Sequence, residues 1–198
     1  MAGKVKAVKG SVRKKGFSVS GKNLKEIWDD LKRNPLKSSD AVGAADTLID
    51  VGAIKDFDVE DDEYAVEKDG HVGVAITPKK GEVTMTTTIT LPELKSDKDL
   101  SDKAKKEWAR FLKELSRHED EHVAKAFEVA EEIADELSNL RTQGSGKDKK
   151  AAQLAAEKAF AEQYKKWYGG SEVQKRVKKA HDDFDGRGNT FKLDTSIE

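Results

Sequence analysis

Two histidines four positions apart are the residues in this sequence most able to do chemistry. They are His118 and His122 of the segment SRHEDEHVAK, and Glu119 directly follows the first. On a helix, residues i and i+4 share a face, so both imidazoles can point at one metal ion. A zinc ion with three protein ligands keeps a fourth position for water, and a glutamate beside that water can take its proton. The spacing therefore predicts two zinc ligands, with Glu119 as general base.

A third ligand has to come from elsewhere in the chain. The continuation VAKAFEVAEE has neither a glycine nor a third histidine, which excludes the metzincin pattern. One candidate is a glutamate on the following helix, Glu157 or Glu162. The others are His181 and Asp185, which lie four positions apart on the inward stripe of the last predicted helix. Both could be ligands, or one could orient the other.

The alternative is that the two histidines are ordinary core residues. Apolar side chains recur along this helix in steps of three and four, and the stripe passes through both histidines. Its members are Trp108, Phe111, Leu112, Leu115, Ala126, Val129 and Ile133. Imidazoles that face a core need partners, because a buried polar group without one costs roughly 1–3 kcal/mol. A metal ion would satisfy both, whereas in the alternative each donates to a nearby carbonyl or carboxylate.

Residues 1–96 predict an antiparallel sheet with one helix. Two short candidate strands, KVKAVKG and GFSVSG, come before the amphipathic helix NLKEIWDDLKRN. From residue 46 to 94, alternating and β-branched residues separated by glycine turns predict hairpins. The last of these strands, EVTMTTTITL, is the candidate edge strand that would pair with an extended peptide, and the alternative is ordinary pairing within the sheet.

Residues 97–185 predict the helical part. A long helix over 97–140 carries the two histidines, a second covers 148–167 and a third covers 172–185. The first two form an antiparallel hairpin, and the polar stretch TQGSGKDKK predicts the loop between them. The tail 186–198 is predicted to be irregular. Together these patterns predict one α+β domain over residues 1–198.

Composition narrows the possible partners. The chain has 37 Lys and Arg against 38 Asp and Glu, so its net charge of −1 gives no reason to expect nucleic acid. It has no cysteine, so a metal must be held by His, Asp or Glu. No apolar run approaches the ~20 residues of a membrane span, and the first residues lack the apolar core of a signal peptide. A peptide or protein substrate is therefore the partner that the motif predicts.

Four segments in this order resemble a known bacterial family. They are SGKNLKEIWDDL, TMTTTITLPEL, EWARFLKELSRHEDEHVAKAFEVAEEI and HDDFDGRG. They resemble a family of domains of unknown function described as predicted secreted zinc-dependent proteases, over about Gly16 to Gly188. The resemblance implies a secreted or periplasmic protein with His118 and His122 as ligands and Glu119 as base.

The end of the chain departs from the pattern of that family. Phe184 and Asp185 match an aromatic–aspartate pair that the family carries near its end. The family continues with His-Gly, but here GRGN follows. By the resemblance, any ligand role of that histidine is lost or moves to His181.

These observations predict a zincin-like α+β metallopeptidase. It would use Zn²⁺, held by His118, His122 and a third ligand from the His181 to Asp185 segment, to hydrolyse peptides with Glu119 as base. The alternative is a catalytically inactive zincin-like binding module that still holds zinc.

Overall fold

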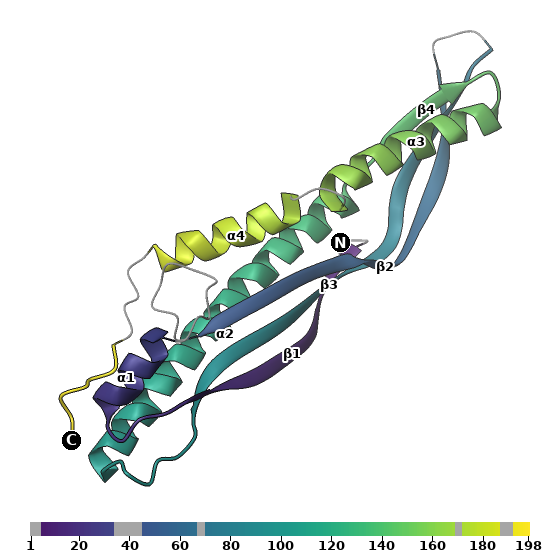
Figure 1. Cartoon of the computed structure of the whole chain (residues 1–198). Coiled ribbons are helices and arrows are strands. Elements are labelled where there is room, and N and C mark those ends of the chain that lie inside the picture. The colour runs from purple at the N-terminus through teal and green to yellow at the C-terminus, as the bar shows by residue number, and fades with distance from the viewer. Residues whose placement is uncertain (1–4, 34–44, 67–69, 169–171, 187–191) are drawn as a thin grey trace. The chain divides into compact units, whose positions relative to one another are not determined.

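The computed structural model describes residues 5–33, 45–66, 70–168, 172–186 and 192–198. Within these ranges four strands and four helices follow one another along the chain (Figure 1). The predicted α+β class is confirmed. The predicted antiparallel sheet is wrong, because the sheet is mixed. The elements are β1 (Val5–Val19), α1 (Leu24–Arg33), β2 (Asp46–Ala65), β3 (Val72–Leu94), α2 (Asp102–Ser138), β4 (Thr142–Gly146), α3 (Lys149–Tyr168) and α4 (Glu172–Asp185).

Strand β3 is the centre of the sheet. The strand order is β1-β3-β2, and β4 pairs antiparallel with the start of β3, from Val72 opposite Gly146 to Ile76 opposite Thr142. Along β3 the side chains alternate, with Val83, Met85 and Ile89 buried. The expectation that residues 82–91 form an edge strand is wrong, because β3 has neighbours on both sides.

Strand β4 replaces a predicted loop. Its glycines are needed for close packing against α3, because a Cβ on Gly144 would lie 2.3 Å from the backbone nitrogen of Ala156. Ala152 and Ala156 on the facing side of α3 are fully buried. A Gly-rich stretch that looks like a flexible loop here lets a strand backbone approach a helix.

The chain folds as two compact units. The first unit contains residues 1–10, 51–86 and 126–180, and the second contains residues 11–50, 87–125 and 181–198. Each unit therefore takes residues from both the sheet and the helices. All the residues of the candidate site belong to the second unit, so the description below stays within it.

Helix α1 builds much of the second unit's core. Asn23 caps the helix by accepting a hydrogen bond from the Glu26 N–H at 2.9 Å, while Glu26 accepts one from the Lys22 N–H at 2.8 Å. Leu24, Ile27 and Leu31 are buried in one cluster with Ala104 and Trp108 of α2. Figure 1 shows α1 beside the first turns of α2. The predicted helix 23–34 is thus present over Leu24–Arg33.

Helix α2 positions the histidines. It begins after Ser101, whose hydroxyl accepts a hydrogen bond from the Ala104 N–H at 3.2 Å, and it runs for 37 residues. The predicted apolar stripe is buried, with Phe111 and Leu115 before the histidines and Ala126 after them. Because His122 continues this stripe, its ring is buried as well. None of the helices in the described part of the chain is long and apolar enough to cross a membrane.

Candidate metal centre

Three side chains in the second unit bring their ligand atoms together. The Nε2 atoms of His118 and His122 lie 3.0 Å apart. Asp185 Oδ1 lies 3.2 Å from the first and 3.1 Å from the second. Two of the residues come from α2 and the third is the last residue of α4. These three residues could hold a metal ion.

The triangle fits a tetrahedrally coordinated ion. With metal–ligand distances of about 2.0–2.1 Å, the ligand atoms of a regular tetrahedron lie about 3.3 Å apart. The three observed separations of 3.0, 3.1 and 3.2 Å are slightly shorter and nearly equal. A single proton can bridge only two of these atoms at a time, whereas one cation can contact all three. The donor set, two imidazoles and one carboxylate, is also one that catalytic zinc sites use.

Burial keeps both imidazoles in the form that binds metal. Desolvation lowers the pKa of His122 to about 4 and also lowers the pKa of His118, although the Asp185 carboxylate opposes both shifts. Both rings are therefore neutral at neutral pH, as ligation requires. The Asp185 side chain is 34% exposed, so the site is accessible from solvent on that side.

Phe184 packs the histidine rings in place. It stacks on His118 with ring centroids 4.9 Å apart, and it meets His122 edge-on at 4.9 Å. Phe184 lies on the buried stripe of α4, and the residue is only 7% exposed. A rigid aromatic neighbour of this kind fixes the orientation of ligand side chains.

The candidates for the third ligand lie at different places in the structure. Asp185 joins the two α2 histidines, whereas His181 is not part of the group of three. The His181 ring lies 4.6 Å from the His122 ring, tilted by 48°, so it is a close neighbour of the site. Glu157 and Glu162 are exposed residues of α3 and do not belong to the group either.

Glu119 is buried beside the two histidines. It is 5% exposed, and its Oε2 accepts a 2.6 Å hydrogen bond from the Thr47 hydroxyl. Burial raises its pKa to about 7; the Thr47 hydroxyl opposes this shift, and the carboxylates of Asp46, Asp185 and Asp120 add to it. A carboxyl group with a pKa near neutrality can take up and release a proton under ordinary conditions.

Thr47 was missed by sequence reasoning. It is the second residue of β2, and it reaches Glu119 across 72 positions of the chain. A threonine near the start of a strand carries no signal of its own. Only the packing of β2 against α2 brings its hydroxyl to the carboxylate.

Fold and site together define an α+β protein whose longest described helix carries a candidate metal centre. The sequence profile of the family described as "Bacterial protein of unknown function (DUF922)" matches residues 14–192, and the chain belongs to this family. No curated protein and no solved structure matches the chain. The description of the family assigns no activity to its members.

Proposed function

We propose that this protein is a zinc-dependent peptide hydrolase. The observation that carries the proposal is the triangle formed by His118, His122 and Asp185, with the buried carboxyl of Glu119 next to it. A site of two histidines and one carboxylate leaves one coordination position of zinc open, which is the arrangement of catalytic rather than structural zinc sites.

In the proposed reaction, three residues would bind the metal ion and Glu119 would transfer the proton. His118, His122 and Asp185 would hold the ion, which when bound supplies the Lewis acidity that polarises a peptide carbonyl and activates water at neutral pH. Thr47 holds Glu119 Oε2, so Oε1 is the oxygen that would exchange the proton. Glu119 would take a proton from water as the water oxygen bonds to the carbonyl carbon. It would then return that proton to the amide nitrogen as the C–N bond breaks.

Metal content is the first test of this proposal. Elemental analysis of protein purified without a metal-affinity tag should give about one zinc per chain, as expected for one three-ligand site. The His118→Ala and Asp185→Ala variants should lose the zinc, while His181→Ala, a change at a neighbouring ring outside the group of three, should retain it. Absence of zinc from the wild type, even after zinc is added back, would contradict the proposal.

Activity is the second test. Zinc-loaded wild-type protein, incubated with a mixture of unfolded peptides, should produce new peptide termini that mass spectrometry can detect. A chelator should stop the cleavage, and added zinc should restore it. Zinc binding without cleavage would leave only the metal-binding part of the proposal standing.

A second candidate function is a zinc-holding binding module without catalysis. The specific observation in its favour is the segment GRGN after Asp185, where the resembled family carries His-Gly. Such a module would bind zinc and extended peptides but leave them intact. Equilibrium binding of peptides that are recovered uncleaved, by protein with a full complement of zinc, would favour it over the hydrolase.

A further inference from the structure

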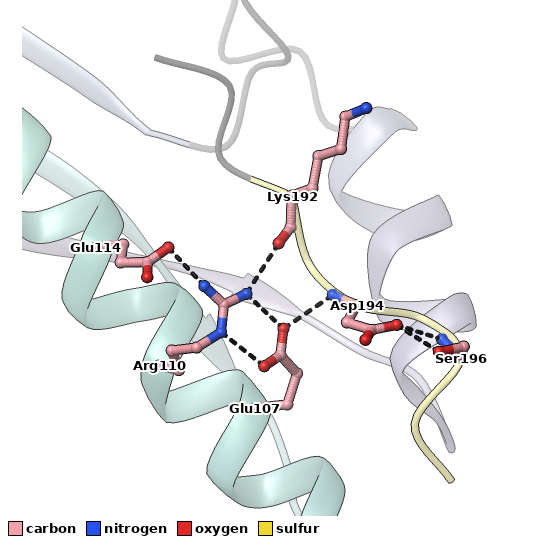
Figure 2. A network of polar contacts seen from close by, with 6 residues as sticks. All are labelled: Glu107, Arg110, Glu114, Lys192, Asp194 and Ser196. Atoms are coloured by element: carbon pink, nitrogen blue, oxygen red, sulfur yellow. Dashed lines mark hydrogen bonds and ion pairs between the residues drawn. The ribbon is translucent and has the colours of Figure 1, made fainter.

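A second polar cluster in the same unit anchors the end of the described chain to α2. Glu107 accepts two hydrogen bonds from the Arg110 guanidinium, at 2.7 and 2.6 Å (Figure 2). Arg110 also donates to Glu114 at 2.6 Å. The Glu107 side chain is only 7% exposed, so this is a largely buried carboxylate with a bidentate arginine partner.

Two backbone groups of the tail join this cluster. The Asp194 N–H donates to Glu107 Oε1 at 2.9 Å, and the Lys192 carbonyl accepts from Arg110 at 3.0 Å (Figure 2). Between them, Leu193 is 5% exposed and belongs to the core that α1 and α2 build. The Asp194 carboxylate in turn accepts two hydrogen bonds from Ser196, at 3.0 and 2.6 Å. The predicted irregular tail is thus free of helix and strand over 192–198, but it is firmly docked.

The anchor and the candidate metal centre lie on the same face of α2. Glu107 precedes His118 by three helical turns, which corresponds to roughly 16 Å along the axis. Asp185 precedes Lys192 by only seven positions in the sequence. Seven residues reach at most about 23–25 Å, so a docked tail confines Asp185 to the neighbourhood of the α2 segment that bears His118.

From these contacts we infer that Glu107 and Arg110 are positioning residues for the third metal ligand. By holding Lys192 and Asp194 on α2, they keep Asp185 close to His118 and His122. The inference rests on the proposed metal site. It adds that Glu107 and Arg110, on an earlier part of α2, help to keep the ligand Asp185 in position. It also makes the link reciprocal: if tail docking favours metal binding, metal binding must favour tail docking by the same factor.

A matched pair of variants tests the link. Glu107→Ala removes the acceptor of the Asp194 N–H and the main partner of Arg110. Glu114→Ala removes the other carboxylate that accepts a hydrogen bond from Arg110. Among the hydrogen bonds found in the described residues, none joins Glu114 to the tail. Zinc affinity, measured by competition with a chromophoric chelator, should fall about tenfold in Glu107→Ala, the range typical of lost support for a metal ligand. It should stay unchanged in Glu114→Ala.

The wild-type protein provides a second readout that needs no variant. Hydrogen exchange at the Asp194 amide should slow when zinc is added, because that amide reports docking of the tail. Equal zinc affinities in wild type and Glu107→Ala, or an Asp194 exchange rate that does not respond to bound zinc, would overturn the inference and leave the metal site intact. A wild type that binds no zinc would instead contradict the proposed function itself.

Discussion

Helix α2 carries two buried carboxylates in the second unit, and their surroundings are opposite. Glu107 faces a guanidinium, and its hydrogen bonds with Arg110 hold its pKa below the ordinary value of 4.5. Glu119 faces the neutral hydroxyl of Thr47, and burial raises its pKa to about 7. Both residues are largely hidden from solvent, at 8% and 5% exposure. At Glu107 the hydrogen bonds from Arg110 outweigh the desolvation that would raise the pKa, whereas at Glu119 desolvation outweighs the single hydrogen bond from Thr47.

This difference separates a structural cluster from a candidate functional one. At Glu107 the chain supplies its own cation, and the cluster is complete as folded. Around Glu119, the neighbouring charges that affect its pKa are carboxylates. Such a cluster is suited to an added divalent cation, which would be the largest charge in the site and would favour ionised carboxylates. Four predictions test this contrast, and they are ordered by the size of the expected effect.

Loss of the Glu119 carboxylate is the strongest test of the contrast between the structural Glu107 cluster and the candidate functional Glu119 cluster. In Glu119→Gln the amide cannot accept the proton from water, so peptide hydrolysis should fall by about 100- to 10,000-fold, as for the loss of a general base. Zinc content should stay at the wild-type level, since Glu119 is not among the three ligand residues. Glu121→Gln, a change at an exposed neighbour, is the matched control and should cleave normally. Unchanged cleavage by Glu119→Gln would remove the proposed mechanism.

Removing the metal should have the next largest effect. With free zinc at a few hundred times its Kd, binding to the folded state adds about 3–4 kcal/mol to the free energy of unfolding. Denaturant titrations with zinc and with a chelator should differ by that amount in the wild type. The difference should vanish in His118→Ala. A chelator that shifts both proteins equally would mean that the stabilising metal lies elsewhere.

Loss of the Thr47 hydroxyl should lower the rate of hydrolysis less than loss of Glu119 does, because Thr47 acts only by orienting the Glu119 carboxylate. Thr47→Val keeps the shape of the side chain but removes the hydroxyl that donates to Oε2, so the carboxylate loses its fixed orientation. A hydrogen bond to a charged group contributes about 1.5–3 kcal/mol, and we expect a roughly tenfold lower kcat. Thr47→Ser retains the hydroxyl and should restore the wild-type rate. A serine variant as slow as the valine variant would show that the methyl group, and not the hydroxyl, is what counts.

Acidification should produce the smallest of the four effects, a modest loss of stability at the cluster formed by Glu107 and Arg110. Because the pKa of Glu107 is lowered on folding, its contribution to stability is present above the unfolded value of 4.5 and is lost as the pH falls through the lower folded value. Arg110 is 43% exposed, so water screens the pair and the contribution is modest. The Asp194 amide resonance should move with pH below 4.5 in the wild type. That movement should be smaller in Glu107→Gln, where the Asp194 carboxylate still titrates but residue 107 does not.

Much of the helical half could be predicted from the sequence. The apolar stripe of α2 was visible because its period survives a highly charged surface, and it placed His122 on the buried face. Helix α4 has the predicted bounds, Glu172–Asp185, and its inward stripe brought both candidate ligands toward α2. Spacing alone does not distinguish them, since His181 and Asp185 share that stripe. The structure groups Asp185, and not His181, with the two α2 histidines.

Features that depend on contacts between residues far apart in the chain could not be predicted from the sequence. Gly and Ser predict a loop at the position of β4, whereas its pairing with β3 joins residues 66 to 74 positions apart. Two short strands were predicted where the single strand β1 runs over Val5–Val19. Glu107 is one of many charged residues in a chain that is 38% charged, and no sequence pattern marks it as an anchor. Its role appears only once the tail has folded back onto α2.

The tight contact between β4 and α3 has a consequence for the order of folding. The Thr142 hydroxyl reaches the Ala156 carbonyl across 14 positions, whereas Thr47 reaches Glu119 across 72. Closing the shorter loop costs less chain entropy, so contacts of the first kind can form early and those of the second kind only late. In pulse-labelled exchange, amides of α3 should thus be protected before those of β2 near Thr47. A newly made chain would then pass through a stage in which it is partly folded but has no assembled metal centre.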